Sequence, residues 1–325
     1  MVKSLLNAAC LFLALSFLAH AQTTTMASNL EEPRVEPASL FTVSAPVDEV
    51  RLTFTVTDKN GKFIKALTEQ DFHLLDNVEP PEHVIRFQAH SDSPLRVVML
   101  FDISSSIKYR FDFEQKAANN FLKHVLRPGI DKASVVSFGT DVHEVQPMTG
   151  DIGLLTSAIS HLQPGGDTAL HDAVILAARE LAKDNSGIDT RKLIIILSDG
   201  ADTSSHAHAN ACMAAAISSE ATILVVDASV PSERDSPGQR FLRKVAENSG
   251  GFVLPARQDS ELKSAFQMIA GVLRNQYSFS YKPATFERNG GFRKIELTAK
   301  KKGLVVHSRN GYYARRETET EPSAR

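Results

Sequence analysis

Three short polar segments contain the side chains best suited to chemistry. The first is D-I-S-S-S, in which Asp102 is followed by hydroxyls at Ser104 and Ser106. The second is G-G-D-T, which ends at Thr168, and the third is S-D-G, which is centred on Asp199. The first and third segments directly follow apolar runs, and the second directly precedes an amphipathic stretch. We therefore expect all three to be loops next to regular elements.

Together these segments offer two carboxylates and three hydroxyls. Such an all-oxygen donor set suits Mg²⁺, which prefers hard oxygen ligands and gives up its water reluctantly. Two aspartates would balance the charge of the ion, and small hydroxyl ligands would leave room for waters and for one open position. A carboxylate from another molecule could fill that position.

Apolar runs alternate with amphipathic stretches between residues 95 and 275. The runs at 97–101, 193–197 and 223–226 are typical of strands buried on both faces of a parallel sheet. Six stretches have the apolar spacing of helices: residues 113–126, 152–162, 169–182, 207–219, 239–248 and 259–273. The alternation predicts an α/β fold with a doubly wound, mostly parallel sheet. Its first and fourth long strands would lie side by side where the winding reverses, which brings Asp102 and Asp199 together in a crevice.

Alternating polar and apolar residues flank this region. Leu52, Phe54 and Val56 alternate before a predicted hairpin turn at 58–62, and the alternation returns after residue 276. Because neither flank is long enough to bury its own core, we expect them to pair into one small antiparallel β-sandwich with the α/β domain inserted.

The predicted organisation follows from these patterns. It comprises a signal peptide (1–21), a flexible linker (22–46), an N-terminal β unit (47–93), the α/β domain (94–275), a C-terminal β unit (276–315) and a polar tail (316–325).

Residues 1–21 have the features of a secretory signal peptide. Lys3 precedes an apolar run, and Ala19-His20-Ala21 forms a small-residue cleavage pattern. No later run reaches the roughly 20 apolar residues that a membrane-spanning helix needs, so we expect no anchor in the mature chain. Export to the periplasm, the cell surface or the medium is therefore expected.

The overall charge disfavours nucleic-acid binding. The chain has 36 Lys and Arg against 38 Asp and Glu, a formal net charge of −2, so no strongly basic face is expected. Its 2 cysteines are too few for a disulfide framework. Cys10 lies in the signal peptide, and Cys212 is expected to be a small buried hydrophobe.

The three segments resemble the von Willebrand factor type A (VWA) domains that have a metal-ion-dependent adhesion site. The resemblance covers about residues 95–275 and depends on D-I-S-S-S, G-G-D-T-A-L-H-D-A and L-S-D-G in this order. It implies that Ser104, Ser106 and Thr168 are hydroxyl ligands and that Asp102 and Asp199 are carboxylate ligands. It further implies Mg²⁺ as the cofactor, with Mn²⁺ and Ca²⁺ as alternatives.

The flanks add a second resemblance. The segments T-D-K-N-G at 57–61, residues 67–72 and R-N-G-Y-Y at 309–313 are similar to exported bacterial VWA-related proteins known mainly from acidobacterial genomes. The two resemblances together imply a secreted, non-enzymatic adhesion module that binds an acidic group of a protein or peptide ligand. They leave the ligand and the oligomeric state open.

Each motif alone has a simpler interpretation. Asp and Ser are common in caps and turns, Thr168 alone could be an N-cap, and Asp227 could be a turn residue. A structural envelope protein with a vestigial metal site is the main alternative. A zinc site at His206-Ala207-His208 is disfavoured because residues two apart on a helix diverge and no third ligand is evident.

Enzyme functions have less support. An aspartyl-phosphate phosphatase would want a second carboxylate where Ser104 stands, and the sequence lacks a nucleophile elbow, a phosphate loop and a dinucleotide loop. A serine hydrolase would need a histidine beside Ser104 or Ser106. His143, His161 and His171 are available, but their spacing favours none of them.

Overall fold

The structure is a computed structural model that describes residues 49–89, 92–183, 190–229 and 235–314. The predicted signal peptide, linker and polar tail lie outside these ranges. Among the described residues, no helix has both the length and the apolar character needed to cross a membrane.

A six-stranded sheet forms the centre of the α/β domain, in the order β6-β5-β4-β7-β8-β9. Its strands are β4 (Leu95–Asp102), β5 (Lys132–Phe138), β6 (Val142–Thr149), β7 (Arg191–Ser198), β8 (Thr222–Asp227) and β9 (Val253–Pro255). All neighbours are parallel except β5 and β6, which are antiparallel. The predicted doubly wound, mostly parallel sheet is confirmed.

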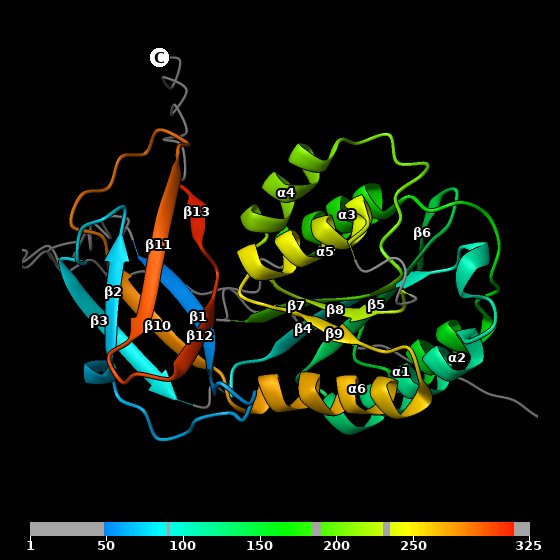
Figure 1. Ribbon diagram of the computed structural model, residues 1–325, viewed down its shortest axis with the longest axis horizontal. Coiled ribbons are helices and arrows are strands. Elements are labelled where there is room, and N and C mark those ends of the chain that lie inside the picture. The colour runs from blue at the N-terminus through cyan, green and yellow to red at the C-terminus, as the bar shows by residue number, and fades with distance from the viewer. Residues whose placement is uncertain (1–48, 90–91, 184–189, 230–234, 315–325) are drawn as a thin grey trace, which may run out of the picture. The chain divides into compact units, whose positions relative to one another are not determined.

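Helices cover both faces of this sheet (Figure 1). One face packs against α1 (Phe111–Val125), α2 (Ile152–His161) and α6 (Asp259–Arg274), and the other against α3 (Leu170–Ala182), α4 (Ala209–Ser218) and α5 (Pro237–Asn248). Along β4, Met99 contributes to the first core and Leu100 to the second. This two-sided burial explains why the strand is apolar without alternation.

The two flanks form two small antiparallel sheets that share one core. The sheet orders are β12-β1-β10-β3 and β13-β11-β2. Their strands are β1 (Val50–Asp58), β2 (Phe72–Asp76), β3 (His83–Ala89), β10 (Tyr277–Lys282), β11 (Phe292–Ala299), β12 (Leu304–Ser308) and β13 (Gly311–Tyr313). N-terminal β1 pairs with C-terminal β10 and β12, and β2 pairs with β11, so the predicted joint β unit is confirmed.

Aromatic rings fill the core between these two sheets. The ring of Phe54 stacks on Tyr277 and on Phe279, each with centroids 5.5 Å apart, and meets Phe72 edge-on at 5.1 Å. Phe54, Tyr277 and Phe279 belong to one sheet and Phe72 to the other, so these contacts join the two sheets.

The predicted turn at 58–62 forms after β1, and the antiparallel pairing that follows it is short. The Gly61 amide donates to the Asp58 carbonyl at 3.0 Å, and the amides of Asp58 and Ile64 donate to the carbonyls of Lys62 and Val56, each at 2.9 Å, around an isolated bridge between Thr57 and Phe63. The chain then crosses to the second sheet, where β2 pairs with β11. The apolar side chains of β2 are buried there against the first sheet, which outweighs an extension of the short local hairpin.

A buried carboxylate joins four strands of the sandwich. Asp76 is 1% exposed and accepts hydrogen bonds from the hydroxyls of Tyr281 and Tyr312, both at 2.9 Å, and from Nε of Arg293 at 2.8 Å. These residues come from β2, β10, β13 and β11, respectively. Removing one partner of a buried ion pair leaves the other charge uncompensated.

We therefore expect Asp76→Ala to lower the free energy of unfolding by about 3–5 kcal/mol, as is usual when a buried pair is broken. Urea denaturation of the sandwich, followed by tyrosine fluorescence, measures the change. Glu296→Ala is the matched control, because it breaks the exposed pair with Lys294 on β11 and should cost about 0–1 kcal/mol. Equal losses of unfolding free energy in the two variants would contradict a stabilising role for the buried Asp76.

Candidate metal centre

Asp102 is the last residue of β4 and is fixed from two sides. Its Oδ1 accepts the backbone amide of Ser104 at 2.8 Å, and its Oδ2 accepts the hydroxyl of Ser198 at 2.6 Å. Ser198 ends the neighbouring strand β7, which is parallel to β4. The carboxylate is fully buried, so its orientation is set by these two bonds.

A chain of hydroxyl contacts leads from Ser104 to Asp199. The hydroxyls of Ser104 and Ser106 are 3.0 Å apart, and the Ser106 hydroxyl donates to Oδ2 of Asp199 at 2.5 Å. Asp102 and Ser104 are buried, Asp199 is half-buried and Ser106 is exposed. The four side chains thus form one cluster that opens to solvent at Ser106.

The backbone of Thr168 contacts the loop that follows β7. Its amide donates to the hydroxyl of Thr203 at 3.0 Å, and its carbonyl accepts the amide of Thr203 at 2.8 Å. The preceding residues contact the first loop, because the Ser105 amide donates to the carbonyl of Gly166 at 3.2 Å. The structure therefore brings the three predicted loops together, and it places Thr168 beside the third loop.

Two glycines permit this close approach. Gly166 has φ of +94°, and a Cβ there would lie 2.8 Å from the hydroxyl oxygen of Thr140. Gly200 has φ of +93°, and its missing Cβ would lie 2.8 Å from the side-chain nitrogen of Gln239. A side chain at either position would force a loop away from the cluster.

Gln239 on α5 holds the third loop but was not among the predicted site residues. Its amide nitrogen donates to the backbone carbonyl of Asp199 at 2.5 Å and to Oδ1 of Asp227 at 3.0 Å. No motif in the sequence indicates this role. Ser198, in contrast, stands within the L-S-D-G segment, and its place directly before Asp199 is the signal that could have identified it.

A second buried ion pair lies beneath the site. Nε of Arg110 is 3.2 Å from Glu114, and the other guanidinium nitrogens donate to the carbonyls of Ala228 at 2.7 Å and Ala256 at 2.6 Å. Burial, with a smaller contribution from the charges of Asp102 and Asp199, raises the pKa of Glu114 to about 7 against the opposing effect of Arg110. No pattern in the sequence indicates that this pair is buried.

The pKa of Asp102 is also raised by burial and by a neighbouring negative charge. Burial raises the pKa of Asp102 to about 6, while its bonds with Ser104 and Ser198 act in the opposite direction and the nearby charge of Asp199 adds to the increase. Three carboxylates therefore interact in this region, and Arg110 is the cation paired with one of them.

Three histidines contact carboxylates or a backbone carbonyl. His171 pairs with Asp202 at 3.0 Å, and the exposed His206 pairs with Asp172 at 3.3 Å. The Nδ1 of His161 contacts the carbonyl of Ser157. Within the described ranges, no group of three or more His, Cys, Asp or Glu side chains is placed to hold a metal, and the proposed donor set contains only two residues of these types.

Two other sequence predictions concern single residues. Cys212 is fully buried, as predicted, and burial raises the pKa of its thiol to about 12, which makes it a poor nucleophile. Asp227, predicted as a turn residue, ends β8 and accepts the amide of Ser229 at 2.8 Å. Its Oδ1 also accepts a hydrogen bond from the side-chain amide of Gln239 at 3.0 Å.

Residues 97–201 match the family model of the von Willebrand factor type A domain. This segment includes all five predicted ligands. No curated protein matches the chain.

Several solved structures are similar in fold. The von Willebrand factor type A protein from Catenulispora acidiphila is 15% identical with a TM-score of 0.47, over 85% of this chain and 75% of that chain. The PilB minor pilin from Streptococcus sanguinis is 15% identical with a TM-score of 0.45, over 61% and 63%. The pilus adhesin SpaC from Lactobacillus rhamnosus GG is 11% identical with a TM-score of 0.46, over 78% and 49%. The chain thus spans less than two thirds of either pilus protein.

The burial of Glu114 predicts a specific pH dependence. Because its pKa in the folded protein is about 7 and its usual value is 4.5, the folded state binds its proton more tightly than the unfolded state does. The free energy of unfolding should therefore fall as the pH rises from about 4.5 to about 7. Glu114→Gln should remove this loss of stability, because glutamine does not titrate. The free energy of unfolding of the variant, relative to that of the wild type, should therefore be about 3 kcal/mol higher at pH 7.5 than at pH 4.5.

Urea denaturation across this pH range, in the presence of a chelator, measures the difference. Asp112→Asn changes an exposed acid on the same helix and is the matched control. A constant difference between wild type and Glu114→Gln at every pH would contradict the prediction.

Proposed function

We propose that the protein is an exported, non-enzymatic binding module in which Mg²⁺ at the candidate site holds a carboxylate of a protein ligand. The observation that supports this most is the contact chain from Ser104 through Ser106 to Asp199, beside the buried Asp102. These are oxygen donors within hydrogen-bonding distance of one another at the end of two adjacent parallel strands.

The donor set fits a hard divalent cation. Ser104, Ser106 and Thr168 would supply hydroxyl oxygens, and Asp102 and Asp199 would supply the two negative charges that balance the ion. The set contains no thiolate and no imidazole, which are the ligands that softer metals prefer. When bound, Mg²⁺ supplies a positive charge that attracts an incoming carboxylate.

The exposure of the donors suggests where the ligand arrives. Asp102 and Ser104 are buried and would hold the ion from below, whereas Ser106 is exposed and Asp199 half-exposed at the mouth. An acidic side chain of a partner would approach from that side. This is the role expected of an adhesion module, and it requires no nucleophile or general base.

The main alternative functions make different use of the same residues. A hydrolase would need a histidine to activate Ser104 or Ser106, yet among the described residues these hydroxyls contact each other and Asp199 instead. A structural envelope protein with a vestigial site would keep the fold without binding the ion. Metal binding distinguishes this alternative from our proposal.

We expect Mg²⁺ to bind the purified mature chain and Asp102→Ala to abolish binding, because the substitution removes one of two balancing charges. Ser106→Ala, which removes only an exposed hydroxyl, should weaken binding at least tenfold and tests the site without disturbing a buried group. Isothermal titration calorimetry measures both. Asp167→Ala is the matched control, since it removes an exposed acid next to Thr168.

The same ion should stabilise the fold. A ligand at one hundred times its dissociation constant adds about 2.7 kcal/mol, so the melting temperature of the wild type should rise with Mg²⁺ and that of Ser106→Ala much less. Equal affinities of wild type, Asp102→Ala and Ser106→Ala would rule out this metal site.

Partner capture should depend on the ion, because the ion provides the attraction for the ligand carboxylate. Immobilised wild-type protein should retain a partner from envelope extract with Mg²⁺ and lose it in EDTA, and Ser106→Ala should retain little under either condition. Addition of Mg²⁺ after EDTA should restore capture. Retention that is unchanged in EDTA would place the binding surface elsewhere and favour a structural role.

A further inference from the structure

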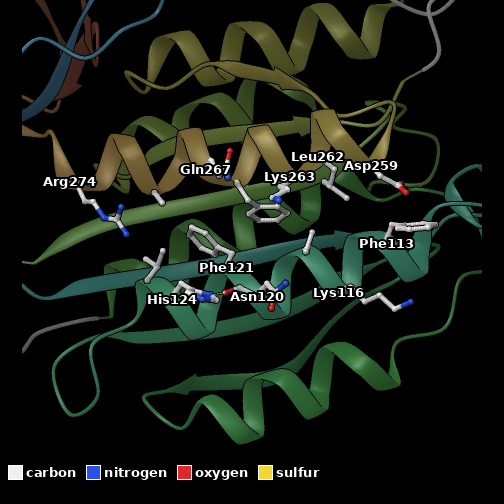
Figure 2. Close-up of a pocket in the computed structure, with 14 residues that line it drawn as sticks. Phe113, Lys116, Asn120, Phe121, His124, Asp259, Leu262, Lys263, Gln267 and Arg274 are labelled. Atoms are coloured by element: carbon white, nitrogen blue, oxygen red, sulfur yellow. Dashed lines mark hydrogen bonds between the residues drawn. The ribbon is translucent and has the colours of Figure 1, made fainter.

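A groove of about 610 Å³ lies between α1 and α6, on a different part of the α/β domain from the three loops. Figure 2 shows the two helices side by side, with Phe113 and Asp259 at one end and His124 and Arg274 at the other. The helices are therefore parallel. None of the residues that line the groove belongs to the candidate metal centre.

The floor of the groove is apolar and fixed. The rings of Phe121 and Phe266 are buried, with centroids 5.3 Å apart, and they join the two helices. Ala117 and Ala270 also line the groove and remain partly buried. Small side chains at these positions leave space above the contact between the helices, where larger ones would have filled it.

The rim of the groove is positively charged. Lys116 and Lys263 project from opposite helices, Arg274 lines one end, and Asp259 is the one acid among the lining residues. Within the part of the chain that the structure describes, neither Lys116 nor Lys263 forms an ion pair. This local excess of positive charge stands out because the whole chain has a formal net charge of −2.

One end of the groove exposes a large ring. Phe113 is 46% exposed, and the ammonium of Lys116 lies 5.7 Å from the centre of its ring. An exposed aromatic ring that continues an apolar floor, next to cations, provides an anchor position for a partner.

We propose that this groove docks an acidic amphipathic helix of a partner protein. The lining of α6 runs from Asp259 to Arg274, a length of roughly 22 Å at 1.5 Å per residue, which accommodates about four turns of a third helix. Apolar side chains at helical spacing would cover Phe121, Phe266 and the alanines. Glu or Asp side chains on both flanks would meet Lys116 and Lys263.

This inference is independent of the metal centre, and the experiment keeps the two apart. Two labelled 16-residue peptides share the same Leu spacing, and one has Glu wherever the other has Lys. Fluorescence anisotropy with the mature chain should show at least tenfold tighter binding of the acidic peptide. Binding should be the same in Mg²⁺, in EDTA and with Ser106→Ala, whatever the outcome at the metal site.

Two kinds of variant locate the binding to the groove. The double charge reversal Lys116→Glu with Lys263→Glu should weaken binding of the acidic peptide at least tenfold. Ala270→Phe should also weaken its binding, because the larger side chain fills the groove without a change of charge. The control reverses Lys123 and Lys244, which are exposed on α1 and α5 but do not line the groove. Each variant should retain a melting temperature close to that of the wild type.

Three results would overturn the proposal. Equal binding of the acidic and basic peptides would show that the positively charged rim does not contribute to binding. An equal loss with the control reversal would show that only the overall charge matters. Sedimentation that shows a wild-type dimer, converted to a monomer by Lys116→Glu, would identify a second copy of the chain as the occupant instead.

Discussion

Parallel pairing between β4 and β7 determines where the polar groups of the site can lie. Phe101 is opposite Leu197, so Asp102 and Ser198 leave the sheet at the same level and Asp199 follows directly. The Ser198 hydroxyl donates to Asp102, and the hydroxyl of Ser106, in the loop that directly follows Asp102, donates to Asp199. The spacing of the cluster is thus set by two adjacent, buried strands, β4 and β7, whereas isolated loops would have to become ordered at an entropic cost.

That arrangement places several acids close together, and the surrounding chain offsets part of their repulsion. Ser198 and the Ser104 amide donate to the carboxylate of Asp102, and Gln239 donates to the carboxylate of Asp227. Arg110 pairs with Glu114 and also binds carbonyls that follow β8 and β9. The compensation is incomplete, because burial and mutual repulsion still raise the pKa values of Asp102 and Glu114. A cation in the cluster would complete it.

The sequence was informative wherever a pattern was local. β4 and β7 are buried on both faces and therefore read as unbroken apolar runs, and Asp102 and Asp199 stand directly at their ends. β6 has no comparable pattern, since it is an edge strand without a buried side chain and contains Pro147. Gln239 and the Arg110–Glu114 pair were missed for a different reason. Their roles depend on contacts with residues distant in the chain, and an Arg–Glu spacing of four is also common on exposed helix surfaces.

The shared β-sandwich has a consequence for the order of folding. β3 and β10 are neighbours, with Ala89 opposite Tyr277, although the entire α/β domain lies between them in the chain. Strands β1 and β2 must remain without their main partners until the chain has been synthesised beyond β10 and β11. A folded α/β domain holds its own two ends in place, so much of the entropic cost of closing this long loop is met before the strands pair. The α/β domain should thus fold first and hold the flanking segments close together, and the strands of the sandwich should pair last.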